Sequence, residues 1–147
     1  MKKSSSKETA SLTDPMAARL GYQLRRVSVL MMADLGTRLA SLGLRPAEVS
    51  ILLIIGANAG CRQGEVGEAL GIKPANMVAL VASLIKQGFV ARARADGRSH
   101  ALSLTPKGRA RTVAVNKLMD QHESAFGSRL NQKSLNGLLA ALVTLRG

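Results

Sequence analysis

The segment from residue 63 to residue 87 constrains the fold most, because its apolar residues recur at helical spacing in two short stretches. The stretches are Gln63–Leu70 and 74–87, and a tight turn containing Gly71 separates them. Two short helices joined by a glycine-containing turn are typical of a helix-turn-helix unit. We therefore expect the second of them to be the helix that inserts into a DNA groove.

The hydrophobic period then changes from about 3.6 residues to 2 residues. Alternating residues in 90–94 and 100–104 lie on both sides of Asp96-Gly97, which is a strong hairpin signal. The sequence therefore predicts a two-stranded wing directly after the helix-turn-helix unit.

Amphipathic helices are expected on both sides of this winged unit. Asp14 and Pro15 have the residue types of an N-cap and a first helical position, and Pro46 opens a second helix. After the wing, Thr105-Pro106 opens a long helix and Asn131 caps a last one. The apolar stripes of the terminal helices are too long for a small winged unit to bury, so we expect a homodimer.

The charge of the chain indicates a nucleic-acid partner and restricts its kind. Lys and Arg number 21 against 9 Asp and Glu, a net charge of +12, and aromatic residues make up only 2%. Scarce aromatic residues argue against modules that stack bases, so double-stranded DNA is the expected partner. Residues 86–117 hold eight basic residues and one acidic residue, which favours a phosphate-binding surface here over a solvated face of mixed charge.

Over about residues 15–146 the sequence resembles the MarR family of bacterial transcriptional regulators. The resemblance lies in the stretch QGEVGEALGI at 63–72, in Asp96-Gly97-Arg98-Ser99, and in LSLTPKG at 102–108. It implies a dimeric winged helix-turn-helix repressor that a small organic ligand, aromatic or anionic and including thioesters, releases from a palindromic operator. The expected fold is mainly α with a small β-hairpin wing.

We divide the chain accordingly into four parts. Residues 1–13 are a polar arm, 14–44 an N-terminal dimerisation helix, 45–104 the DNA-binding domain and 105–147 the C-terminal dimerisation helices.

The candidate recognition helix carries few polar side chains. Asn76 can pair with an adenine edge, and small apolar residues can contact thymine methyl groups, so we expect an A/T-rich pseudo-palindrome. The alternative for Asn76 is an exposed residue of the first helical turn. The DNA-contacting residues expected here are Lys73, Pro74, Ala75, Asn76, Val78, Ala79 and Ser83.

In the wing, the family pattern places Arg98 in a minor groove, where an arginine senses narrow width and negative potential. Asp96 would orient that guanidinium through a charge-assisted hydrogen bond. The alternative is that Asp96-Gly97 merely forms a solvated turn. Arg92, Arg94 and His100 complete the expected wing contacts.

Relatives commonly bind ligands where the dimerisation helices meet the winged domain. Tyr22, Arg25 and Arg26 are the candidate effector-binding residues, and the two arginines would suit an anion. The alternative for the arginines is a surface or phosphate contact.

Two other functions are alternatives. Cys61, beside Arg62, is a candidate oxidant sensor, and the alternative is an inert, buried cysteine. A non-specific architectural DNA-binding protein would use the same charge without an operator. We expect no enzyme, cofactor or metal site, since His100 and His122 have no catalytic partners nearby in the sequence. We expect a cytoplasmic, nucleoid-associated protein with no membrane segment.

Overall fold

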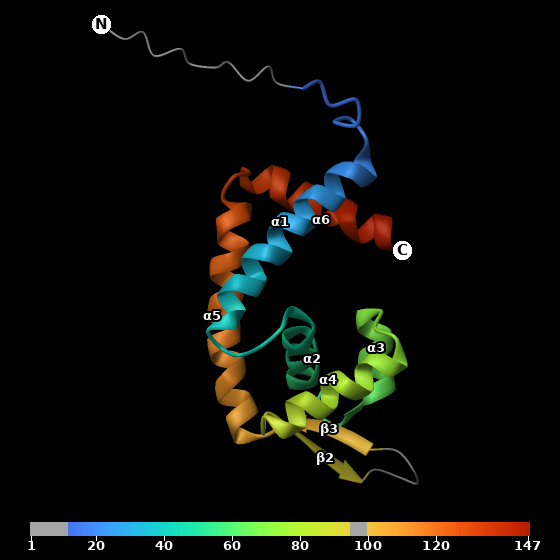
Figure 1. The fold of residues 1–147 in the computed structure, drawn as a ribbon, viewed down its shortest axis with the longest axis vertical. Coiled ribbons are helices and arrows are strands. Elements are labelled where there is room, and N and C mark those ends of the chain that lie inside the picture. The colour runs from blue at the N-terminus through green and yellow to red at the C-terminus, as the bar shows by residue number, and fades with distance from the viewer. Residues whose placement is uncertain (1–11, 95–99) are drawn as a thin grey trace, which may run out of the picture.

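Helices dominate the fold, and a small sheet lies at one end of the molecule (Figure 1). The computed structural model describes residues 12–94 and 100–147, so the predicted contacts of Asp96 and Arg98 lie outside the described residues. The mainly α fold with a β wing is confirmed. In chain order the elements are α1 (Leu20–Ala40), α2 (Pro46–Ala57), β1 (Cys61–Arg62), α3 (Gln63–Leu70), α4 (Pro74–Lys86), β2 (Val90–Arg94), β3 (His100–Leu104), α5 (Pro106–Gly127) and α6 (Gln132–Arg146).

The sheet is antiparallel and has the strand order β1-β3-β2. The two predicted wing strands have the expected bounds, and Arg92 pairs with Leu102. On the other side of β3, Cys61 also pairs with Leu102. The strand β1 was not predicted, because a pair of residues is too short to show a period of two.

The turn between α3 and α4 has the predicted geometry. Gly71 adopts the left-handed conformation with φ of 64°, and the Ile72 N–H donates to the Gly67 carbonyl at 2.8 Å. These are the features of a glycine C-cap, which satisfies carbonyl groups at the helix end. Pro74 then occupies the first position of α4, where no N–H is needed.

The prediction that Asp14 caps the first helix is wrong, because α1 begins at Leu20. The Asp14 carboxylate instead accepts hydrogen bonds from the Met16 N–H at 2.9 Å and the Tyr22 hydroxyl at 2.8 Å. Asp14 therefore organises the turn that precedes α1. The predicted caps at the other end of the chain are confirmed: Thr105 accepts from Gly108 N–H at 2.9 Å and Asn131 from Ser134 N–H at 2.8 Å.

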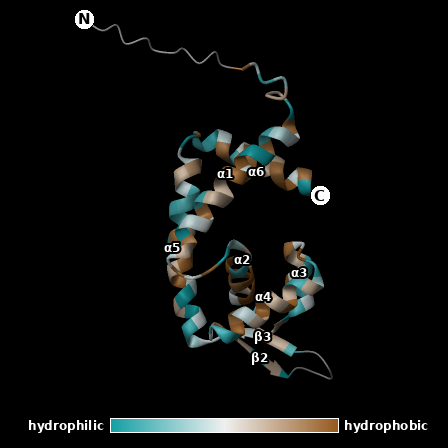
Figure 2. Cartoon of the chain, viewed as in Figure 1, coloured by the Kyte–Doolittle hydropathy of each residue, from teal (hydrophilic) through white to brown (hydrophobic). Residues whose placement is uncertain are grey.

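The core is built around α2, which is strongly apolar (Figure 2). Val49, Ile51, Leu52 and Ile55 of this helix are all buried. The same core takes Leu35 and Leu39 from α1 and Val115 from α5, besides residues of the winged unit. The C-terminal half of α1 and the middle of α5 therefore pack on the winged unit.

Large apolar side chains remain exposed on the terminal helices. No residue of α6 is buried, and α6 lies at the end of the molecule opposite the sheet (Figure 1). Exposed apolar side chains in such number indicate an interaction site. The exposed residues of α1 and α6 include Leu20, Leu24, Val27, Leu30, Leu138, Leu139, Leu142 and Val143.

Among the described residues, no single helix has the length and hydropathy to cross a membrane. Only α3 and α4 taken together reach that length and hydropathy, and they are bent by 115° relative to each other.

The start of α5 packs closely against the two residues that precede β2. Thr105 donates its hydroxyl to the Gly88 carbonyl at 2.6 Å, and its N–H to the Phe89 carbonyl at 3.0 Å. Gly108 is buried directly against the Phe89 backbone. Only glycine permits this approach of two backbones.

Gly108→Ala should therefore destabilise the protein, because the added methyl group would overlap the Phe89 carbonyl oxygen. We expect a loss of about 3 kcal/mol in the free energy of unfolding, measured by urea denaturation. Gly64→Ala is the matched control, since a methyl group there meets nothing within 4 Å on helix α3. The control should change stability by less than about 1 kcal/mol, and equal effects of the two substitutions would refute the packing argument.

Candidate nucleic-acid interface

The outward face of α4 is made of small, uncharged side chains. Met77, Val81 and Leu84 anchor the helix in the core, which leaves the opposite face in solvent. Five of the predicted contact residues on this helix are exposed, as is Lys73 before it. Ala82 and Lys86, which were not predicted, continue the face by helical spacing. The exposed predicted residues on α4 are Pro74, Ala75, Asn76, Val78 and Ala79.

Ser83 does not belong to this face, contrary to the prediction. Its hydroxyl donates to Glu48 Oε1 at 2.7 Å and accepts from Gln87 Nε2 at 3.1 Å. Ser83 lies on the flank of α4 that faces α2, where a buried acceptor satisfies it. No local pattern in the sequence indicates this partner, which is 35 residues away.

Glu48 is a buried carboxylate, with 2% of its surface exposed. Its Oε2 accepts the Arg45 N–H at 2.9 Å, and its Oε1 lies 3.2 Å from Arg45 Nη2. Burial alone would raise the pKa of Glu48, but the hydrogen bonds from Arg45 and Ser83 outweigh it and lower the pKa. Glu48 therefore stays ionised and ties the start of α2 to α4.

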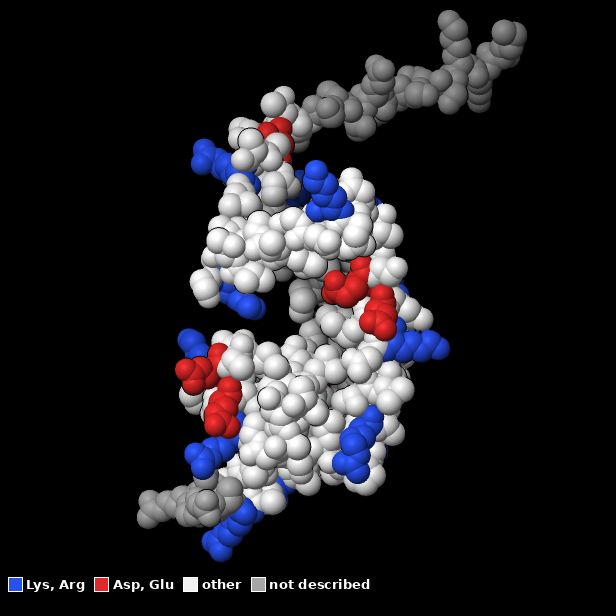
Figure 3. Space-filling model, turned by 180° about the vertical axis from the view of Figure 1, so that it is seen from behind, with Lys and Arg blue, Asp and Glu red and all other residues white. Residues whose placement is uncertain are grey.

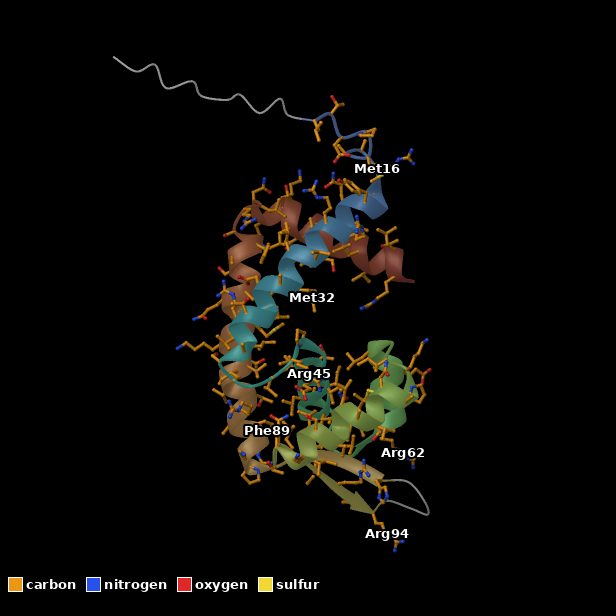
Figure 4. All side chains as sticks on the ribbon, in the orientation of Figure 1. Met16, Met32, Arg45, Arg62, Phe89 and Arg94 are labelled. Atoms are coloured by element: carbon orange, nitrogen blue, oxygen red, sulfur yellow. The ribbon has the colours of Figure 1, made fainter. Side chains whose placement is uncertain are left out.

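Three exposed wing residues lie on the face of the hairpin that also contributes a buried side chain to the core. Arg92 pairs with Leu102, and Arg94 pairs with His100, so all four side chains share one face of the hairpin. Leu102 is buried, whereas Arg92, Arg94 and His100 are exposed. Arg94 projects from the outer end of β2 in Figure 4. The sequence-predicted wing residues that the structure describes are thus brought together.

A groove of about 330 Å³ separates this hairpin face from α4. The β1–α3 junction also contributes to it through Arg62, which was not predicted as a site residue. The lining residues are Arg62, Gln63, Gly64, Val78, Arg92, His100 and Leu102.

Not every basic residue in 86–117 is available for phosphate. Lys107 donates to the Gln87 carbonyl at 2.8 Å, Arg109 to the Leu104 carbonyl at 2.9 Å, and Arg111 to the Leu42 carbonyl at 3.4 Å. These residues hold the start of α5 in place. The space-filling view from behind nevertheless shows basic side chains at the sheet end of the molecule (Figure 3).

The predicted effector residues lie at the N-terminal end of α1. Tyr22 donates to Asp14, and Arg26 Nη1 lies 3.3 Å from the Tyr22 hydroxyl and 3.8 Å from Asp14 Oδ2. Arg25 is exposed. The structure therefore engages Tyr22 and Arg26 in a local cluster with Asp14.

A larger cavity, of about 460 Å³, lies between the end of α1, the start of α2 and the second half of α4. Tyr22, Arg25 and Arg26 do not line it. No short motif marked this cavity, since its walls come from separate helices. Its lining residues are Gly36, Ala40, Gly43, Leu44, Arg45, Pro46, Glu48, Ser83 and Gln87.

Two further side chains are explained by packing. Burial, and then the Glu65 carboxylate, raise the pKa of the Cys61 thiol, which disfavours the reactive thiolate form.

His122 is 3% exposed, and its Nδ1 lies 2.8 Å from Asp34 Oδ2. The Arg38 guanidinium and then His122 lower the pKa of Asp34. The His122–Asp34 pair links α5 to α1.

Comparisons with known proteins agree with this geometry. A model of the MarR family matches residues 42–99. The HTH-type transcriptional repressor Rv2887 of Mycobacterium tuberculosis is 29% identical over 130 residues, which cover 85% of this chain and 94% of the repressor.

Solved structures of the transcriptional repressor CouR are similar over nearly the whole chain. CouR bound to a 23-mer DNA duplex is 34% identical, with a TM-score of 0.88, and covers 94% of this chain and 100% of CouR. CouR bound to p-coumaroyl-CoA is 33% identical, with a TM-score of 0.83, and covers 92% of this chain and 98% of CouR.

Glu48→Gln should lower the free energy of unfolding by about 1–3 kcal/mol near neutral pH, since charge-assisted hydrogen bonds are lost. Because folding lowers the pKa of Glu48, this stabilisation is fully present above the ordinary value of 4.5 and is lost as the pH falls through the lowered pKa. Urea denaturation from about pH 7 to about pH 3.5 should show the two proteins converging. Glu68→Gln, at an exposed carboxylate of α3, is the control. A difference that stays constant over this range would contradict the prediction.

Proposed function

Because the chain belongs to the MarR family of transcriptional regulators, we propose that it is a homodimeric repressor that a small organic effector releases from a palindromic operator. One observation carries the proposal: the small, uncharged face of α4 lies beside the arginine-bearing face of the hairpin. This arrangement suits base contacts in a major groove and phosphate contacts next to it. The DNA duplex in the CouR structure supports it.

We assign base contacts to α4 and backbone contacts to the wing. Asn76 supplies the hydrogen bonds for an adenine edge, and Val78 contacts thymine methyl groups. Arg92 and Arg94 bind phosphates, while Asp96 orients Arg98 in the adjacent minor groove. An A/T-rich pseudo-palindrome is the operator that fits these side chains.

The dimer is proposed to form through the terminal helices. Residues 14–44 and 105–147 supply this layer, and 45–104 supply the DNA-binding domain. The exposed apolar side chains of α1 and α6 support the assignment, because a second copy would bury them. Two recognition helices would then meet successive major grooves.

We place the effector in the 460 Å³ cavity rather than at Tyr22, Arg25 and Arg26. Its volume is within the usual range for small-molecule sites. Arg45, whose side chain is 67% exposed, can bind an anionic or thioester-bearing aromatic ligand. Ser83 and Gln87 connect the cavity wall to α4, so occupancy would favour a position of α4 that misses the operator. The p-coumaroyl-CoA complex of CouR supports this class of effector.

Selection of bound fragments from genomic DNA, followed by gel-shift competition, tests the proposed function. We expect a pseudo-palindromic duplex that binds about 10³-fold or more tightly than unrelated DNA. Arg98→Ala should cost about 1–3 kcal/mol of binding to that duplex. A specificity ratio near one would show a non-specific architectural protein and refute the repressor.

The cavity is tested by Ala40→Phe, which fills it from the last residue of α1. Wild type should leave the selected duplex when p-coumaroyl-CoA, the ligand of the CouR complex, is added. Because a filled cavity should bias α4 as the effector does, the variant should bind the duplex more weakly than wild type, and added effector should weaken its binding no further, as measured by fluorescence anisotropy. Ala57→Phe, at an exposed alanine that does not line the cavity, is the control. Unchanged release from Ala40→Phe would exclude the cavity.

A further inference from the structure

A buried carboxylate forms part of the wall of the 460 Å³ cavity. Glu48 lines the cavity although its side chain is only 3% exposed, and Ser83 and Gln87 of α4 line it nearby. A charge buried to this extent is stable only where hydrogen bonds replace its solvation. The hydrogen bonds that Glu48 already accepts therefore decide which ligand group can lie against it.

The hydrogen bonds of Glu48 leave one acceptor position open. An ionised carboxylate has about four such positions, two on each oxygen. Those of Oε1 are filled by Arg45 Nη2 at 3.2 Å and by the Ser83 hydroxyl at 2.7 Å. Within the described parts of the chain, Oε2 accepts only the Arg45 backbone N–H, at 2.9 Å. One position on Oε2 is thus available to a donor from a ligand.

The α1 side of the cavity leaves room for a flat ring. Its lining residues there, Gly36 and Ala40, are four residues apart and so lie on one face of the helix. A methyl group added to Gly36 would meet nothing within 4 Å, and the same holds for Gly43 in the following loop. An aromatic ring can therefore lie beside α1 with one edge toward Glu48.

The charges of the cavity give a bound ligand a direction. Among the described residues that line it, only Arg45 and Glu48 are charged. Arg45 lies at the start of α2 (Figure 4), and its side chain is 67% exposed, whereas Glu48 is buried. The lowered pKa of Glu48 keeps it ionised at neutral pH, so a second anion beside it is disfavoured. The anionic end of a ligand should therefore lie toward Arg45, and its buried end should be uncharged.

We propose that Glu48 determines effector specificity by accepting, at Oε2, a hydrogen bond from an uncharged hydroxyl or amino group on the aromatic ring. This inference rests on the proposed function and adds to it a specificity-determining residue and a ligand orientation. A ring without a donor would exclude water from the carboxylate and give no hydrogen bond in return. A ring that carries a carboxylate at this position would meet a like charge.

A series of thioesters that differ only at the para position of the ring tests the proposal on the wild-type protein. The series is p-coumaroyl-CoA with a hydroxyl, p-aminocinnamoyl-CoA with an amino group, cinnamoyl-CoA with hydrogen, and p-carboxycinnamoyl-CoA with a carboxylate. Isothermal titration calorimetry should show that cinnamoyl-CoA binds about 10- to 100-fold more weakly than p-coumaroyl-CoA. The amino compound should bind more tightly than cinnamoyl-CoA, and the carboxylate compound more weakly.

Two variants assign this preference to Glu48. In Glu48→Gln the ratio of the p-coumaroyl-CoA and cinnamoyl-CoA affinities should fall at least about fivefold, because a neutral amide is a weaker acceptor than a carboxylate. Ser83→Ala is the matched control, since it removes a donor from the same carboxylate but leaves Oε2 unchanged. Its ratio should stay within about twofold of wild type. A ratio taken within one protein cancels effects on stability or on the position of α4, which affect both ligands alike.

The possible results separate the contact from the proposed function. Equal affinities of wild type for p-coumaroyl-CoA and cinnamoyl-CoA, with both releasing the selected duplex, would overturn the contact and leave the proposed function standing. A ratio that Glu48→Gln leaves unchanged would overturn the assignment to Glu48. If that variant does not fold, the thioester series on wild type decides. Binding of none of the thioesters would overturn both the contact and the proposed effector class, whereas loss of operator preference in wild type would refute the repressor itself.

Discussion

The buried carboxylate of Glu48 is the interaction on which the position of α4 depends. A charge out of contact with water is tolerated only when hydrogen bonds replace its solvation, and Glu48 receives them from the Arg45 backbone and guanidinium and from Ser83. These donors come from the start of α2 and from the flank of α4. The apolar contacts of Met77, Val81 and Leu84 hold α4 in the core, and the hydrogen bond from Ser83 to Glu48 fixes one flank of α4 against α2. The face presented to solvent follows from both.

The exposed face of α4 and the adjacent face of the hairpin differ in charge and in side-chain size. The exposed face of α4 is small and almost uncharged, whereas the hairpin face beside it carries Arg92 and Arg94. Three further basic residues, Lys107, Arg109 and Arg111, donate to carbonyl groups around the start of α5. The basic excess of the chain therefore serves two purposes, since part of it faces solvent beside α4 and part of it fastens α5 to the winged unit.

Local patterns predicted the elements well, and contacts between distant residues account for what was missed. Gly71, Thr105 and Asn131 act through neighbours a few residues away, so their roles are visible in the sequence. The carboxylate partners of Ser83 and His122 are 35 and 88 residues away in the sequence. They lie on other helices, and hydrophobic periodicity does not show which helices pack together. The place of Arg62 at the groove could not be predicted, because a two-residue strand leaves no pattern in the sequence. Asp14 has the residue type of a cap, but its hydrogen bonds to Met16 and Tyr22 form a separate turn.

The absence of any buried residue in α6 has a consequence for how this part of the chain is ordered. A helix of 15 residues, standing alone in water, is marginal, and packing normally supplies the energy that maintains it. Since α6 buries no side chain within the chain, its order must be coupled to whatever covers its leucine-rich face. If a second copy covers it, folding of the last tenth of the chain becomes a bimolecular event, governed by mass action. Protein concentration would then set the fraction of molecules in which the C-terminal helix is formed.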